Sequence, residues 1–152
     1  MMNLFIALMF RDDSSVLERL EKEFGAIRTQ SEVFDFTFTR YYEKEFGTGL
    51  RKMFLVFFKQ IERAQLPQIR MQIARIEDEY RRNGRRTVNI DPGALSQESL
   101  IVASLKQRSF KEYLGDGVYG HTVIAFRDGE VQTFSHTFAD YKAHLEFFRK
   151  LR

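Results

Sequence analysis

The chain of 152 residues contains no cysteine and no tryptophan. Without cysteine there is no disulfide framework, thiolate nucleophile or cysteine-ligated zinc, so catalysis would have to use oxygen or imidazole groups. Sixteen Phe and six Tyr bring the aromatic content to 14%, which argues against disorder. The sequence therefore predicts one globular domain over residues 1–152 with an aromatic core.

Several familiar nucleotide-binding and catalytic motifs are missing as well. None of the nine Gly is followed by Lys, which excludes a Walker A loop, and no Asn begins the Asn-Lys-x-Asp string that reads guanine in small GTPases. The chain also lacks a G-x-S-x-G elbow, an H-E-x-x-H helix and a kinase signature. These absences leave open whether the protein is an enzyme.

One G-x-G-x-x-G string is present, formed by Gly115, Gly117 and Gly120. A dinucleotide loop needs a strand before it and a helix after it, because the helix N-terminus holds the pyrophosphate. Here residues 118–126 are rich in β-branched and aromatic residues and precede Asp128-Gly129, a strong hairpin signal. The string therefore favours a turn between strands over a dinucleotide site.

The N-terminal apolar run, residues 1–10, is too short to span a bilayer and lacks the features of a signal peptide. We therefore expect a cytoplasmic protein without a membrane partner. The net charge of +3 permits an anionic partner without requiring one.

The spacing of apolar residues predicts an α+β fold. Strands are predicted at 2–10, 33–39, 50–58 and 86–90 and as a hairpin over 118–135, with Asp91-Pro92-Gly93 as a turn. Helices are predicted at 15–24, 66–80 and from Asp140 onward, with a helical turn at 41–46, while 100–105 fits either state. Because no strict βαβ period appears, we expect a mostly antiparallel or mixed sheet packed with about three helices.

The clearest concentration of charge is the cluster of Arg81, Arg82, Arg85 and Arg86 around Asn83-Gly84. Cations near a helix C-terminus are favoured by the helix dipole, so a solvated helix end explains this cluster. The alternative is contact with phosphate or nucleic acid.

The hairpin brings two histidines together. If Asp128-Gly129 is a two-residue loop, His121 lies across from His136, with Cβ atoms about 4.5 to 5.5 Å apart. Two imidazoles at this distance can share a divalent metal ion or a proton, with Asp91 or Asp116 as a third group. Ordinary solvent-facing histidines are the simpler alternative. Tyr119, on the same face, either orients a ligand or covers the core.

Asp91 and Asp116 have a double interpretation. Asp beside Gly or Pro is first a turn former, because its carboxylate accepts backbone N–H bonds. Two loop carboxylates that meet in space could also bind a cation or act as an acid and a base. For the cluster Tyr41-Tyr42-Glu43, aromatic packing is the preferred explanation.

Four segments carry a resemblance to a known family: YYEKEFG from Tyr41, VNIDPG from Val88, YLGDGVY from Tyr113, and residues 137–141. In this order they resemble a prokaryotic family known only as a domain of unknown function, some of whose members are labelled GTP-binding protein or GTP-binding regulator. The family pattern often has His-Arg where this chain has Phe110-Lys111, and Glu at the position of His121. The resemblance carries Asp91 and Asp116 over as candidate site residues.

Three functions follow from these observations, in order of preference. The first is a ligand-binding or regulatory domain for an anionic nucleotide such as GTP, held by Arg85, Arg86 and the Gly-rich turns. The second is a metal-dependent or acid/base enzyme that uses His121 and His136 with an aspartate. RNA binding through the arginine cluster is last, because the Phe residues fall on positions typical of a core.

Overall fold

The computed structural model describes residues 1–151. Its strands form an antiparallel sheet in the order β2-β4-β1-β5-β6-β8-β7, with β3 added to β4 and β9 to β8. The strands are β1 (Met2–Phe10), β2 (Ile27–Gln30), β3 (Phe34–Asp35), β4 (Arg51–Ile61), β5 (Asn89–Leu95), β6 (Ser99–Ser104), β7 (Glu112–Gly115), β8 (Val118–Arg127) and β9 (Glu130–Thr133). The helices are α1 (Ser15–Phe24), α2 (Glu43–Phe46), α3 (Leu66–Glu79), α4 (Ala139–Lys142) and α5 (Leu145–Arg149), with a 3-10 turn η1 (Arg63–Gln65) before α3. The predicted α+β class and antiparallel sheet are confirmed.

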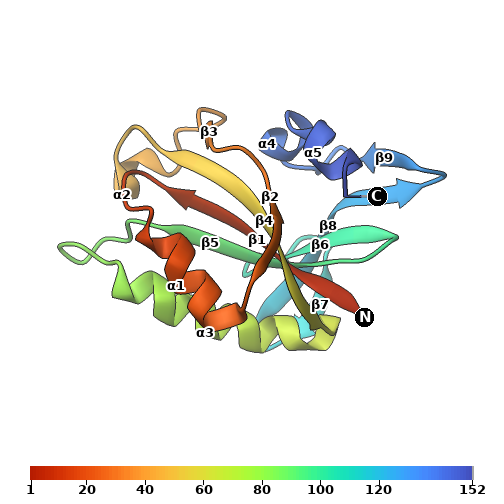
Figure 1. Ribbon diagram of the computed structural model, residues 1–152, viewed down its shortest axis with the longest axis horizontal. Coiled ribbons are helices and arrows are strands. Elements are labelled where there is room, and N and C mark those ends of the chain that lie inside the picture. Colours follow the sequence, from red (N-terminus) through yellow and green to blue (C-terminus); the bar gives the residue numbers. More distant parts are fainter. Residues whose placement is uncertain (152) are drawn as a thin grey trace.

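Strand β1 lies in the middle of the sheet and is buried on both faces, as its continuous apolar run predicts. Leu4, Ile6 and Leu8 pack on one face in the same core as the apolar sides of α1 and α3. Phe5 and Ala7 point to the other face, where α4 and α5 contribute Tyr141 and Phe148. Figure 1 shows this arrangement, with α1 and α3 on one side of the sheet and α4 and α5 on the other.

Two predicted elements are shorter than their patterns suggested. Of the strand expected at 33–39, only Phe34–Asp35 forms β3, because Asp35 pairs with Arg51, the first residue of β4, and later residues have no strand partner. The C-terminal helix is divided into α4 and α5 at His144, whose Nδ1 lies 2.8 Å from the Asp140 carbonyl oxygen. The His144 ring also stacks on Phe34, which holds it against the core.

The Asp91-Pro92-Gly93 segment was predicted as a turn, and this was wrong. All three residues lie inside β5, and their neighbours on β1 are Ala7, Ile6 and Phe5. Gly93 is required for space, because an added Cβ would lie 2.5 Å from the Ile101 carbonyl oxygen. The ambiguous segment 100–105 is the strand β6.

The β8–β9 hairpin follows its prediction closely. Asp128 and Gly129 both have positive φ, at 52° and 77°, as a two-residue loop of this kind requires. Arg127 pairs with Glu130, and the ladder ends at Ile124 opposite Thr133. His121 lies in β8 before Ile124, and His136 follows the last residue of β9, so the two histidines are not paired in the strand ladder. Their contact depends on their side chains.

Candidate functional site

A cleft opens where β5 and β6 separate. The two strands pair only over Gly93–Leu95, and beyond Gly93 the strand β5 continues beside β1 while β6 continues beside β8. Pro92 stands at this point and has no N–H to donate to a further ladder. The separation places the end of β6 and the loop after it across a gap from Asp91.

Two adjoining cavities of about 420 and 240 Å³ occupy this gap, and we call them together the β5–β6 cleft. Both cavities are lined by Tyr42, Asp91, Lys106 and Phe138. The larger cavity is also lined by Phe36, Phe38, Thr39, Tyr41, Lys52, Ala139, Asp140 and Tyr141. The smaller cavity is also lined by Arg70, Val102, Ala103, Ser104, Leu105, Lys111 and His121. Their combined size is within the range of small-molecule sites.

The larger cavity has a buried ion pair in its wall. Lys52 Nζ lies 2.5 Å from Asp140 Oδ2, and the two residues are only 7% and 4% exposed. Alternation along β4 places Lys52 on the same face as Phe54, and the ammonium also lies within 6 Å of the Phe36 and Tyr141 rings. The pair joins β4 to α4 and fixes one side of the cavity.

Asp91 lies where the two cavities meet. Burial raises the pKa of its carboxyl, while nearby Lys52 and Arg70 and the hydrogen bond donated by Asn89 Nδ2 act in the opposite direction. Burial, together with the charge of Asp91, raises the pKa of Tyr42 to about 12. The Tyr42 hydroxyl is therefore protonated at neutral pH and is a donor beside a carboxyl group.

The loop between β6 and β7 carries three cations, of which Lys106 and Lys111 line the cleft and Arg108 is exposed on the same loop. Lys111 Nζ donates to Ser104 Oγ and to the Lys106 carbonyl oxygen, and Arg108 donates to the Gln107 carbonyl oxygen. Among the described residues, all of these acceptors are neutral, and Lys106 instead lies over the Tyr41 ring at 4.9 Å. Burial and the neighbouring cations lower the pKa of Lys111. The loop therefore presents positive charge that has no carboxylate partner within residues 1–151.

The predicted histidine pair is in contact, with ring centroids 5.2 Å apart. His121 Nε2 lies 3.0 Å from the His136 carbonyl oxygen, and His136 Nε2 lies 3.1 Å from the Thr122 carbonyl oxygen. A carbonyl oxygen only accepts, so both Nε2 atoms carry hydrogen and are not free to bind a metal ion. Within residues 1–151, no group of three or more His, Asp or Glu side chains is arranged to hold a metal.

His121 has one further property. The residue is 2% exposed, and its Nδ1 is buried without a hydrogen-bond partner among the described residues. Burial first, then Lys111 and His136, lower the pKa of His121 to about 4, so the ring is neutral at pH 7 and its Nδ1 is an unprotonated acceptor. Of the two histidines, only His121 lines the cleft.

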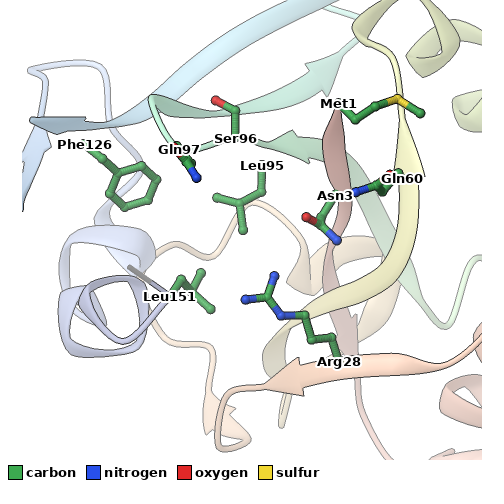
Figure 2. Close-up of a pocket in the computed structure, with 9 residues that line it drawn as sticks. All are labelled: Met1, Asn3, Arg28, Gln60, Leu95, Ser96, Gln97, Phe126 and Leu151. Carbon is green, nitrogen blue, oxygen red and sulfur yellow. The ribbon is translucent and has the colours of Figure 1, made fainter.

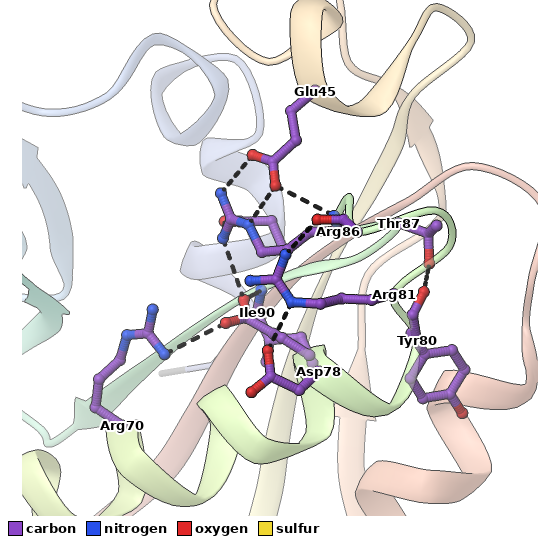
Figure 3. A network of polar contacts seen from close by, with 11 residues as sticks. Glu45, Arg70, Asp78, Tyr80, Arg81, Arg86, Thr87 and Ile90 are labelled. Atoms are coloured by element: carbon purple, nitrogen blue, oxygen red, sulfur yellow. Dashed lines mark hydrogen bonds and ion pairs between the residues drawn. The ribbon is translucent and has the colours of Figure 1, made fainter.

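The arginine cluster lies apart from the β5–β6 cleft. Figure 3 shows the two-pronged contact of Arg86 with Glu45 and the pairing of Arg81 with Asp78. Arg86 also donates to Asn89 Oδ1. Arg82 and Arg85 are exposed and joined through their backbones. None of the four arginines lines the cleft. Arg86 is instead linked to the cleft through hydrogen bonds that run from Glu45 to Arg86, from Arg86 to Asn89 and from Asn89 to Asp91.

The remaining predicted residues also lie outside the cleft. Asp116 occupies the exposed turn between β7 and β8, where its φ is 51°, and it lines neither cavity of the cleft. Tyr119 packs against Tyr113, at a ring distance of 5.1 Å. Gly115 and Gly117 have positive φ in the same turn, which β8 follows directly. The G-x-G-x-x-G string is therefore a hairpin turn, as its context indicated.

Another cavity, of about 540 Å³, lies near the start of β1 (Figure 2). Of its described lining residues, only Arg28 has a charged side chain. In Figure 2 the Arg28 guanidinium points toward Leu151 and Asn3. None of the residues predicted from the sequence lies there, and the buried polar residues Lys52, Asp140 and His121 line the β5–β6 cleft instead.

Sequence reasoning missed several cleft residues, among them Lys52, Arg70, Lys106 and Asp140. A signal existed for Lys52, because it alternates with the buried residues Phe54 and Val56 on an otherwise apolar strand. Lys106 and Arg70 had no such signal, since a lysine in a polar loop or an arginine on an amphipathic helix is ordinary.

Comparison with known proteins identifies the family. The model of the family described as Domain of unknown function (DUF4416) matches residues 1–152, so the chain belongs to this family. No curated protein and no solved structure matches the chain. Within the described residues, no helix is long and apolar enough to cross a membrane.

Proposed function

We propose that the protein binds an anionic small molecule with a planar ring, such as the nucleotide GTP, in the β5–β6 cleft. The observation that carries this proposal is the loop with Lys106, Arg108 and Lys111, whose cations have no carboxylate partner among the described residues. Charge-assisted hydrogen bonds to phosphate or carboxylate are stronger than those to neutral acceptors. An anion at this loop would supply the missing negative charge.

The larger cavity supports the planar part of the ligand. Its walls include the rings of Phe36, Phe38, Tyr41, Tyr42 and Phe138, on which a base can stack. Asp91 and Tyr42 line both cavities, where they can pair with polar edges of a ring. A ligand that spans both cavities thus meets stacking surfaces at one end and cations at the other.

Isothermal titration calorimetry tests this proposal with GTP, ATP, GMP, guanosine and inorganic phosphate. The variant Lys111→Met removes the cation and retains most of the side chain. We expect it to weaken nucleotide binding about 10- to 100-fold, as the loss of a charge-assisted hydrogen bond predicts. Arg85→Met is the matched control, because it removes the same charge from an exposed residue outside the cleft.

Two results would overturn the proposal. One is the absence of binding for every anion in the panel. The other is an equal loss in Lys111→Met and Arg85→Met, which would show that only the net charge of the protein matters.

A second candidate function is acid–base catalysis, favoured by the shared position of His121 and Asp91 on the smaller cavity. The unprotonated Nδ1 of His121 can accept a proton, and burial raises the pKa of Asp91, which makes its carboxyl a weaker acid than that of an exposed aspartate. This function predicts slow conversion of a bound nucleotide or phosphate ester, lost in both His121→Gln and Asp91→Asn. Ligand that is bound but recovered unchanged after long incubation would leave binding as the function.

A further inference from the structure

The mouth of the β5–β6 cleft is surrounded by exposed rings. Ten large hydrophobic residues are exposed among the described residues, and five of them lie at this mouth: Phe38, Tyr41, Leu105, Phe110 and Phe138. Single exposed apolar residues are normal, whereas a contiguous group marks an interaction site. We call the four aromatic members the aromatic rim.

The rim is held in place by contacts with cleft residues. Phe138 lies against His121 with ring centroids 4.7 Å apart, and Phe110 lies 5.1 Å from the same ring. Phe110 also stacks on His136 at 4.3 Å with nearly parallel planes. The rings are therefore positioned by the protein while one side of each stays exposed, at 43% for Phe138 and 44% for Phe110.

The charge between these rings is positive. Lys106 lies over the Tyr41 ring, Lys111 lies within 5.9 Å of the Phe110 ring, and Arg108 is exposed on the same loop. Arg40 is exposed beside Tyr41 in the chain. Rings interleaved with cations fit a polymer that alternates flat bases with phosphates, since bases stack on aromatic side chains and phosphates meet Lys and Arg.

We propose that the aromatic rim binds single-stranded nucleic acid, one nucleotide of which enters the β5–β6 cleft. This inference rests on the proposed nucleotide site and extends it from a free nucleotide to a strand. Its residues differ from the arginine cluster, where the sequence had suggested RNA contact. Double-stranded nucleic acid is a poorer ligand, because its bases are already stacked and cannot reach the rings.

Fluorescence anisotropy with labelled oligouridine and oligothymidine of about ten nucleotides tests the proposal, and this length matches common site sizes. We expect tighter binding than for the mononucleotide, with affinity that falls steeply as salt rises. Phe110→Leu removes a rim ring that lines neither cavity. It should weaken oligonucleotide binding about 5- to 100-fold and leave mononucleotide binding unchanged.

The matched control is Phe58→Leu, because Phe58 is a Phe of β4 that is 63% exposed and outside the rim. Tyr41→Leu, at a residue that is 68% exposed, provides a second rim variant with little risk to folding. Arg108→Ala should reduce the slope of log affinity against log salt concentration by about one, as the loss of one phosphate contact predicts. Equal effects of Phe110→Leu and Phe58→Leu would overturn the proposal.

The two proposals can fail separately. If GTP or GMP binds and the oligonucleotide binds no more tightly, the rim proposal is wrong and the nucleotide site stands. If neither binds, both are wrong. If anionic lipid vesicles bind, with dependence on Phe110 and Tyr41, while oligonucleotides do not, the rim is a membrane-contact surface instead.

Discussion

The ion pair between Lys52 and Asp140 allows a quantitative test of how the cleft is built. The residues are 7% and 4% exposed, and the ammonium has three aromatic neighbours, the rings of Phe36, Phe54 and Tyr141, at 5.2, 6.0 and 5.4 Å. Removing one member of a buried pair leaves the other charge without a partner and costs about 3 to 5 kcal/mol. We therefore expect Lys52→Met to lower the free energy of unfolding by that amount at pH 7.

The double variant Lys52→Met/Asp140→Asn provides the decisive comparison. With both charges removed, no buried ion remains unpaired, so the combined loss should be at least about 2 kcal/mol smaller than the sum of the single losses. Asp140→Asn alone should lose less than Lys52→Met, because the ammonium keeps its ring contacts. For a domain of this size, the loss in Lys52→Met corresponds to a fall in the thermal midpoint of roughly 6 to 20 °C.

The assay is urea unfolding followed by far-UV circular dichroism, since the chain has no tryptophan to report by fluorescence. The exposed pair of Arg149 and Glu146 is the control, and Glu146→Gln should change stability by less than about 0.5 kcal/mol. The reasoning is refuted if Lys52→Met loses less than about 1 kcal/mol, or if the losses in the double variant are additive.

Three further predictions concern residues around the cleft. Burial raises the pKa of Asp91 in the folded protein, so the stability that its carboxyl contributes is full below about pH 4 and is lost as the pH rises through the raised value. In urea titrations, Asp91→Asn should therefore be more stable than the wild type at pH 7 but not at pH 3.5. Gly93→Ala should lower the free energy of unfolding by about 1 to 3 kcal/mol, because its Cβ would clash with a backbone oxygen, and a loss below about 0.5 kcal/mol would contradict that packing. In thermal unfolding, Arg86→Ala should lower the free energy of unfolding by about 1 to 3 kcal/mol, because it removes the contacts with Glu45 and Asn89. The control Arg82→Ala should lower it by less than about 0.5 kcal/mol. Equal effects would show that the network in Figure 3 contributes no stability.

Local patterns predicted most elements and one register. The apolar run of β1, the period of α3 and the Asp128-Gly129 turn each depend on residues close together in the chain, and each was placed correctly. The hairpin count also brought His121 beside His136, although the strand ladder stops before them. The prediction at Asp91-Pro92-Gly93 failed because Pro and Gly signal a turn locally, while the pairing of β5 with β1 and the space needed beside Ile101 decide the outcome.

The sequence by itself determined the fold class and the faces of the main strands and helices, and it named Asp91 and His121 as candidate site residues. Only the tertiary structure showed that Arg86 and Asp116 lie outside it and that Lys52, Lys106 and Asp140 belong to it. The physical reason is that periodicity records which face of an element is buried, whereas the cleft is formed by elements far apart in the chain. Their meeting point depends on strand order and on where β5 separates from β6, which are set by the packing of the whole sheet.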